Sequence, residues 1–404
     1  MAGKQYTLKS TFTQSFASLL FDSAGLLAGG ITSLVAVFVV NMPWILIIYP
    51  PLLTVRGNVN GIYSGRFTTG LHVGQIKPRI RKNTDYFRSL VASIYCMSFL
   101  NAIAISFFSY MVYKIISPST TMSLQVISRI VFVAMLVPST VSIFIITPFV
   151  SIIAYKKGAD PDVIVYPVMS TVNDIFISAI YVIVIYLFIF NQPLFILLSS
   201  VMIVFFFILL LNSLRFVKDR EFKRTLMEGL PTVLVLSFLS NFTGGLLSQF
   251  RFQIAKYPHL LILYPSLIDS VGDEGSIISS VFTTKLSLGF VKPSIKEIFE
   301  EGNKNTIFGT FLAGSLVFII LSIIGSITYF LPIHTVIGTI FVVILTNLVL
   351  LIPISLISFV SSIVTFKYGL NPDNYTIPII SSLSDLLTTL VLFANVIMFS
   401  FLLM

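Results

Sequence analysis

The fold of this chain is decided by the stretch Gly158-Ala-Asp-Pro-Asp-Val-Ile-Val-Tyr-Pro-Val-Met-Ser-Thr-Val-Asn-Asp174. This stretch places a carboxylate at the start of an apolar run that continues to Phe190. The same pattern returns 211 positions later as Gly369-Leu-Asn-Pro-Asp-Asn-Tyr-Thr-Ile-Pro-Ile-Ile-Ser-Ser-Leu-Ser-Asp385. An acidic side chain at the centre of a membrane helix costs roughly 2.5–3.5 kcal/mol or more. Two acids at matched positions therefore predict a functional site inside a membrane.

The composition is typical of a polytopic membrane protein. Hydrophobic residues make up 56% of the 404 residues and charged residues only 10%, whereas soluble domains average about 25% charged residues. The net charge of +9 could indicate an anionic partner such as nucleic acid. We expect it instead to reflect basic cytoplasmic loops, with the lipid bilayer as partner and no nucleic acid.

The distribution of Lys and Arg predicts the orientation in the membrane. With the N-terminus inside, 18 of the 25 basic residues fall in inner loops, 4 at outer positions and 3 within spans. Cytoplasmic loops of membrane proteins collect Lys and Arg. We therefore expect a multi-pass protein of the cell membrane with a cytoplasmic N-terminus and an extracellular C-terminus.

Apolar runs of about 20 residues predict an all-α fold with about 11 transmembrane helices. Residues 49–78 match residues 264–293 at an offset of 215, and Gly29-Gly30 matches Gly244-Gly245 at the same offset. This duplication predicts two five-helix repeats and a linking helix, in residues 1–191, 218–404 and 192–217. Because five spans reverse the side of the membrane, the linking helix makes the two repeats parallel.

One span in each repeat carries residues that break helices. Pro50-Pro51 and Gly57-Asn58 lie in the first copy, and Pro265 and Gly272-Asp273 lie in the second. The pattern predicts that these spans are interrupted and unwound. Non-helical backbone at membrane depth is tolerated where it is buried in protein or lines a wet cavity. The matched Asn58 and Asp273 are therefore predicted to line a pore, the alternative being that they cap half-helices.

Oxygen-rich side chains in these spans suit a divalent cation such as Mg²⁺ or Ca²⁺. The predicted metal ligands are Asp174, Asp385, Asn58, Asp273 and Glu274. Further pore-lining candidates are Gly57, Arg66, Asn173, Ser170, Thr171, Ser381, Ser382 and Asp269. Two alternatives stay open: the matched aspartates could cap helices at the membrane edge, and Arg66 could either snorkel or pair with a pore acid.

Other chemistries find little support in the sequence. The single cysteine, Cys96, lies in an apolar run, and His72, His259 and His334 are scattered without a metal-ligand spacing. No nucleophile–base pair is present, so we expect no enzyme. The matched aspartates alone would permit only an aspartyl-type intramembrane protease, which is the alternative from a different class.

Several motifs resemble the membrane domain of MgtE-type magnesium channels. They are Gly57-Asn58, Ser64-Gly-Arg66-Phe-Thr68-Thr and Leu71-His72-Val-Gly74, followed by Asp-Pro-Asp and Ser-Thr-x-x-Asp174. The fused pair with a linking span resembles the solute carrier 41 family. The resemblance implies that the ion-binding aspartate maps onto Asp174 and Asp385. The second copy departs from the pattern, with Asp273 for Asn58 and Val281 for Arg66.

The resemblance and the residues together predict a magnesium transporter or channel. Mg²⁺ is the expected transported ion, on a path at the interface of the two repeats. The alternative is a Na⁺- or H⁺-coupled exchanger in which the same acids alternate between ions. MgtE-type channels are homodimers, and a fused pair mimics such a dimer, so a monomer is the expected state.

Overall fold

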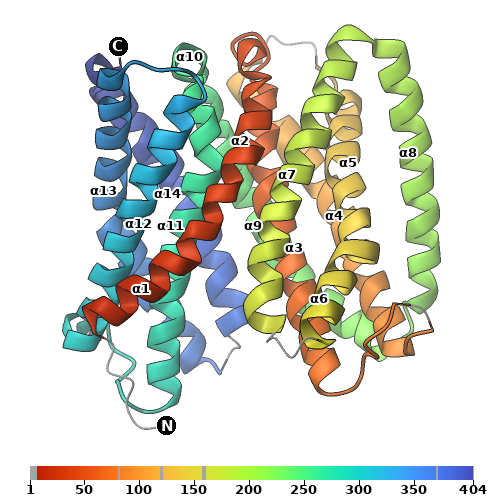
Figure 1. Ribbon diagram of the computed structural model, residues 1–404. Coiled ribbons are helices and arrows are strands. Elements are labelled where there is room, and N and C mark those ends of the chain that lie inside the picture. Colours follow the sequence, from red (N-terminus) through yellow and green to blue (C-terminus); the bar gives the residue numbers. More distant parts are fainter. Residues whose placement is uncertain (1–6, 81, 119–121, 157–160, 370–371, 404) are drawn as a thin grey trace. The chain divides into compact units, whose positions relative to one another are not determined.

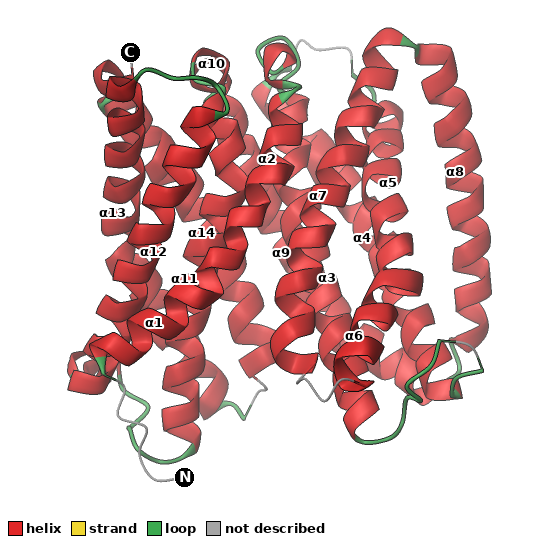
Figure 2. Cartoon of the chain, viewed as in Figure 1, coloured by secondary structure: helices red, strands yellow, loops and turns green. Residues whose placement is uncertain are grey.

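The chain is helical throughout the part that the structure describes. The computed structural model describes residues 7–80, 82–118, 122–156, 161–369 and 372–403, with side chains for all of these except 161–168, 170 and 372–374. In this part of the chain, helices are joined by loops and no strand occurs (Figure 2). The predicted all-α fold is confirmed.

Fourteen α-helices are found in the described residues. In chain order they are α1 (Leu8–Leu19), α2 (Gly25–Ser33), α3 (Trp44–His72), α4 (Asp85–Ile116), α5 (Leu124–Val141), α6 (Thr147–Lys156), α7 (Pro161–Phe190), α8 (Gln192–Ser213), α9 (Arg220–Gln249), α10 (Arg251–Lys256), α11 (His259–Ser287), α12 (Glu301–Ile327), α13 (Ile333–Lys367) and α14 (Pro372–Met398). A 3₁₀ turn, Leu20–Ala24, joins α1 to α2, and a π-helical turn, Ser142–Ile146, joins α5 to α6.

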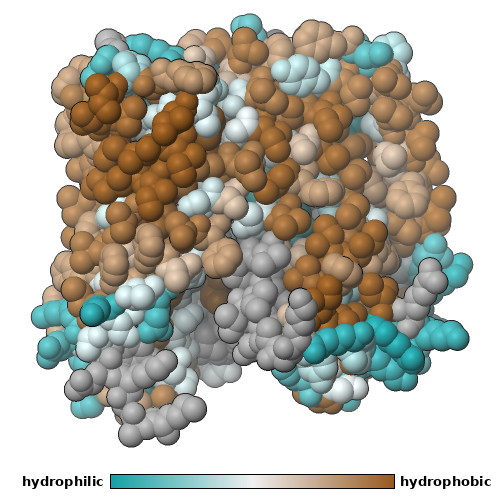
Figure 3. All heavy atoms as spheres, viewed as in Figure 1, coloured by the Kyte–Doolittle hydropathy of each residue, from teal (hydrophilic) through white to brown (hydrophobic). Residues whose placement is uncertain are grey.

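Nine helical segments of the described chain are long and apolar enough to cross a membrane. They are Leu8–Ser33, Asp85–Ile116, Leu124–Lys156, Thr171–Phe190, Gln192–Phe216, Arg220–Gln249, Glu301–Ile327, Ile333–Lys367 and Tyr375–Met398. The helices that would complete the predicted eleven are α3 and α11, whose charged and polar residues lower their hydropathy. In Figure 3, apolar side chains cover the helices and hydrophilic ones gather near helix ends, as expected of a protein surrounded by lipid.

The helices form two compact units that do not follow the two predicted repeats. Unit 1 consists of Met1–Val40 and Gln249–Met404, and unit 2 of Asn41–Ser248. In unit 1, α1 packs along α12 and α2 along α11 (Figure 1). Unit 2 contains α9, which matches α1 and α2 at the offset of 215. Each unit therefore combines the core helices of one copy with the leading helix of the other, while the predicted repeat boundaries themselves stay a prediction.

In each unit, the leading helix packs against a core helix through a close contact at a matched glycine. A Cβ atom on Gly29 of α2 would collide with the carbonyl oxygen of Ile262 in α11. A Cβ atom on Gly244 of α9 would collide with the carbonyl oxygen of Ile47 in α3. Both the glycines and the isoleucines correspond at the offset of 215. The same backbone-to-backbone approach, which only glycine permits, is thus made once in each unit.

The predicted interruption of the proline- and glycine-containing spans is wrong. α3 continues through Pro50-Pro51 and Gly57, and α11 continues through Pro265 and Gly272. Membrane helices tolerate such residues when neighbouring helices cover the freed backbone groups. At Gly272 the missing side chain leaves room for α14, because a Cβ atom there would lie 3.1 Å from Ser384 Oγ. This glycine serves helix packing and not unwinding.

We expect Gly29→Ala and Gly244→Ala each to lower the free energy of unfolding by about 1–3 kcal/mol, because the new methyl group meets backbone that cannot move aside. Gly30→Ala is the matched control, since nothing lies within 4 Å of a Cβ atom there. The measurement is thermal unfolding of the purified protein in detergent. A Gly29→Ala midpoint equal to that of Gly30→Ala would contradict the close approach.

Candidate functional site

The two matched aspartates lie in the middle of long helices. Asp174 in α7 and Asp385 in α14 each follow the first helical residue, Pro161 or Pro372, by more than three turns. This separation corresponds to roughly 20 Å along a helix axis. Asp174 is 5% exposed and Asp385 is 4% exposed. Neither carboxylate can therefore cap the start of its helix, and the alternative of helix caps is excluded.

A matched hydrogen bond sets the register between the helices around each aspartate. The Tyr49 hydroxyl of α3 lies 3.0 Å from Ser178 Oγ of α7. In the second copy the Tyr264 hydroxyl of α11 lies 2.8 Å from Thr389 Oγ1 of α14. Ser178 and Thr389 each lie one turn after the aspartate of their helix. α3 and α7 are therefore aligned in the same register as α11 and α14.

In the first copy the aspartate faces a buried arginine. Arg56 Nη2 of α3 lies 3.8 Å from Asp174 Oδ1, and the Arg56 side chain is only 2% exposed. The distance is that of an ion pair and is too long for a hydrogen bond. Charges inside a membrane protein are tolerated when they are paired. Arg56 and Asp174 therefore compensate each other's charge.

In the second copy no base stands at the corresponding place. The position that matches Arg56 is Val271, which is buried. The surrounding segment of α11 is acidic where α3 is neutral: Thr54, Asn58 and Val59 correspond to Asp269, Asp273 and Glu274. The two copies share a register but carry different charge.

The carboxylate of Glu274 lies in a notch formed by Gly314 of α12. A Cβ atom on Gly314 would collide with Glu274 Oε1, and it would lie 3.3 Å from Asn347 Nδ2 of α13. The Asn347 amide donates to Ser315 Oγ at 3.3 Å. Glu274 Oε1 and Asn347 Oδ1 are buried without a hydrogen-bond partner. Glu274 is thus turned toward α12 and α13, while its neighbour Asp273 is half-buried.

Several buried polar groups on α3, α7 and α14 lack a protein partner. Asn173, adjacent to Asp174, is fully buried and makes no hydrogen bond through either amide atom. Ser382 Oγ and Asn58 Nδ2 are also buried without a partner. Since buried polar groups are normally satisfied by protein or by ordered water, these positions are suited to water or to a hydrated ion.

Arg66 is held by acids of α9. Its Nη1 donates to Glu221 Oε1 at 2.8 Å and to Thr225 Oγ1 at 3.0 Å, and its Nη2 bonds Glu228 Oε2. All of these groups belong to unit 2. The open question about Arg66 is answered in part: it pairs with acids, but not with any of the predicted metal ligands.

The corresponding region of the second copy uses a different cation. Position 281 is Val281, and Lys285 of α11 donates instead to Asn303 at 2.7 Å and to Glu300 at 3.3 Å. Partial burial acts to raise the pKa of the Glu300 carboxyl, but the Gly302 amide and the Lys285 ammonium outweigh it, so that this pKa is lowered. Glu300 is therefore an ionised cap at the start of α12.

The other predicted residues lie on α3, α7, α11 and α14. Thr171 and Ser381 are half-buried on α7 and α14, and a Cβ atom on Gly57 would meet nothing within 4 Å. The side chain of Ser170 lies outside the described residues, as do Gly158, Asp160 and Asn371. Among the residues whose side chains are described, no three His, Cys, Asp or Glu form a group that could hold a metal ion. A cage of carboxylates around a bare ion is therefore not formed by this part of the chain.

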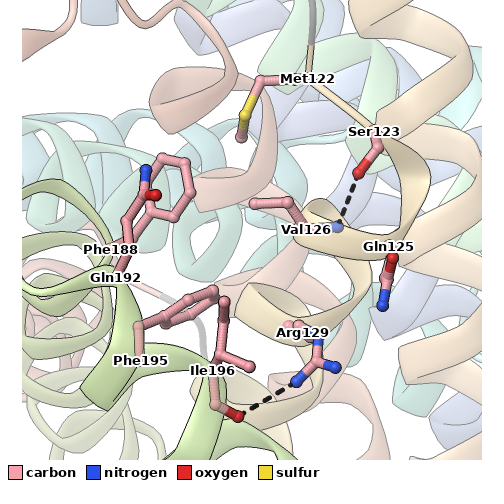
Figure 4. Close-up of a pocket in the computed structure, with 9 residues that line it drawn as sticks. All are labelled: Met122, Ser123, Gln125, Val126, Arg129, Phe188, Gln192, Phe195 and Ile196. Atoms are coloured by element: carbon pink, nitrogen blue, oxygen red, sulfur yellow. Dashed lines mark hydrogen bonds between the residues drawn. The ribbon is translucent and has the colours of Figure 1, made fainter.

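A pocket of about 350 Å³ in unit 2 contains none of the predicted site residues (Figure 4). It is lined by residues of α5, α7, α8 and the loop before α5, namely Met122, Ser123, Gln125, Val126, Arg129, Phe188, Gln192, Phe195 and Ile196. Its charged group, Arg129, donates to the Ile196 carbonyl at 3.3 Å and to the hydroxyls of Ser199 and Ser200. A pocket lined by a base and by no acid does not suit a cation.

The Arg56–Asp174 pair is not among the features predicted from the sequence. A signal for it exists, because Arg56 follows Tyr49 by two helical turns and so shares the face that contacts α7. A second signal is that the second copy has Val271 at the position of Arg56, although the flanking residues of the two copies are similar.

We expect Gly314→Ala to lower the free energy of unfolding by about 1–3 kcal/mol, because the added methyl group displaces the buried Glu274 carboxylate. In a Glu274→Ala background the notch is empty, so adding Gly314→Ala should cost about 0.5 kcal/mol or less. Thermal unfolding of the four proteins of this cycle measures the coupling. Additive effects of the two substitutions would contradict the described contact.

A comparison with protein families matches the two copies of the duplicated segment. The model of the MgtE divalent cation transporter family matches residues 49–184 and 264–395. The two matches begin 215 residues apart and end 211 residues apart, which are the two offsets of the duplication. Searches of curated proteins and of solved structures found no match. Because the two matches cover more than half of the chain, this protein belongs to the MgtE family of divalent cation transporters and carries that family's domain in tandem duplicate.

Proposed function

We propose that this protein lets divalent cations, and Mg²⁺ in particular, cross the membrane by way of its intramembrane acids. The observation that carries the proposal is the pair of matched aspartates, Asp174 and Asp385. Each is buried more than three turns inside a helix of a family-matching segment. Acids at such positions are costly and are kept where they serve an ion path or a relay.

The physical role of the acids is to lower the free energy of a dication within the membrane. A doubly charged ion that moves through the whole membrane potential gains about 4.6 kcal/mol per 100 mV. This gain drives inward flow but does not remove the desolvation barrier at mid-membrane. Carboxylates such as Asp385 and Asp273 lower that barrier, because their charge attracts the cation over several ångströms in a low-dielectric surrounding.

We propose that the ion keeps part of its water shell on this path. Mg²⁺ gives up its water slowly and is commonly held by one or two carboxylates with several waters. The described residues include no cluster of three acids, which agrees with such a mode. The buried and unpartnered groups of Asn173 and Ser382 offer donors and acceptors for these waters.

We expect Asp385→Asn to reduce Mg²⁺ flux at least tenfold, because removing one charge from a site for a dication costs on the order of 1.4 kcal/mol or more. The measurement is Mg²⁺ entry into proteoliposomes that contain a fluorescent Mg²⁺ indicator. Asp85→Asn serves as control, because Asp85 is an exposed acid at the start of α4 whose salt bridge, to Arg88, lies on the surface.

Wild-type flux no higher than that of empty liposomes would refute Mg²⁺ transport. Normal flux in Asp385→Asn would refute the role of the matched acid. The assay is run with and without a Na⁺ or H⁺ gradient. Flux that does not depend on either gradient is the expected result for a channel, and flux that requires one would instead favour the coupled exchanger.

A further inference from the structure

The two copies of the duplicated segment differ most in charge. Between positions 54 and 59, α3 carries one base, Arg56, and no acid. Between the matching positions 269 and 274, α11 carries three acids and no base. Both segments stand beside a helix with a matched aspartate, Asp174 in one case and Asp385 in the other. A cation therefore meets two chemically different surroundings.

The shared register makes the comparison of Arg56 with Val271 meaningful. The bonds from Tyr49 to Ser178 and from Tyr264 to Thr389 align each pair of helices at the same point. Arg56 and Val271 each follow their tyrosine by seven residues, so they occupy the same place relative to the neighbouring aspartate. The guanidinium thus stands where the second copy has an apolar side chain.

Arg56 has the charge, the burial and the position that a cation bound at Asp174 would have. It is positively charged at every physiological pH, it is 2% exposed, and its Nη2 lies 3.8 Å from the carboxylate. At that distance the pair is an electrostatic contact without a tight hydrogen bond. The first aspartate is therefore already neutralised by a side chain that cannot leave the protein.

We propose that Arg56 is a resident counter-cation that occupies the Asp174 site in place of the transported ion, so that the ion is held by the second copy. Asp385 and the α11 acids Asp269 and Asp273 supply the charge for that ion. Glu274 is left out of this set because its carboxylate is turned into the notch at Gly314. This inference rests on the proposed transport of divalent cations.

The competing reading is that Asp174 binds the transported ion directly and that Arg56 only supports the fold. Four variants separate the two readings. Arg56→Val reproduces the valine of the second copy at position 271, Arg56→Lys keeps the positive charge, and Arg56→Val with Asp174→Asn removes both charges. Asp174→Asn alone leaves the arginine without its carboxylate.

The experiment measures KM and maximal rate of Mg²⁺ flux in proteoliposomes, together with the rise in thermal midpoint that Mg²⁺ causes in detergent. Arg56→Val should lower KM by about 5- to 10-fold, because it frees the Asp174 carboxylate to attract Mg²⁺ within its own copy. It should also show a larger Mg²⁺-dependent rise in midpoint than wild type. Arg56→Lys should stay within about twofold of wild type in KM.

The double variant gives the sharpest result. Asp174→Asn alone should raise KM by about tenfold, because the uncompensated Arg56 guanidinium makes the region between α3 and α7 repel Mg²⁺. Adding Arg56→Val should bring KM back to within about threefold of wild type. If the double variant is as impaired as Asp174→Asn, or if Arg56→Val leaves KM unchanged or raises it, Asp174 is a direct ligand and the proposal is overturned.

Failure of the inference can be told apart from failure of the proposed function. Absence of Mg²⁺ flux in the wild type would overturn the transport function. The midpoint measurement still decides on Arg56 in that case, since it reports Mg²⁺ binding without flux. An equal Mg²⁺-dependent rise in wild type and Arg56→Val would overturn the role of Arg56 as a counter-cation.

Discussion

The rest of the structure depends on the burial of carboxylates at membrane depth. A lone charge there is costly, so each acid needs a base, a proton, water or a cation. The protein meets this constraint differently in its two copies. Asp174 is paired with Arg56, whereas the segment beside Asp385 is rich in acids and has a valine at the corresponding position. At Asp174 a side chain of the protein supplies the compensating charge. In the second copy the excess of acids in α11 is suited to a cation.

The fold keeps these helices in register through contacts that occur once in each copy. The tyrosine bonds to Ser178 and Thr389 fix the aspartate helices against α3 and α11. The glycine contacts on Ile262 and Ile47 fix the leading helix of one copy on the core of the other. Because these supports are alike, the different charges at positions 56 and 271 stand on closely similar scaffolds.

Much of this arrangement could be predicted from the sequence, and the failures have physical causes. Repeated identities at fixed offsets reveal the duplication, and the length of the apolar runs reveals the helices. The unwinding predicted at Gly272 is wrong because a glycine serves equally for close packing, and only the position of α14 shows which use applies. The sequence does not show that the leading helix of each copy packs on the core helices of the other copy. Gly29 and Gly244 indicate a close helix contact, but a single sequence does not identify the helix that they contact. The partners of Arg66 were equally hidden, because Glu221 and Glu228 lie more than 150 residues away in the chain.

The most direct test is a cryo-EM map of the wild-type protein in lipid nanodiscs, recorded with Mg²⁺ and with a chelator. We predict ion density beside Asp385 that disappears with the chelator, and an Arg56 guanidinium that stays against Asp174 in both maps. Ion density at Asp174 with Arg56 displaced, or no ion-dependent density at Asp385, would contradict the view that the second copy holds the cation.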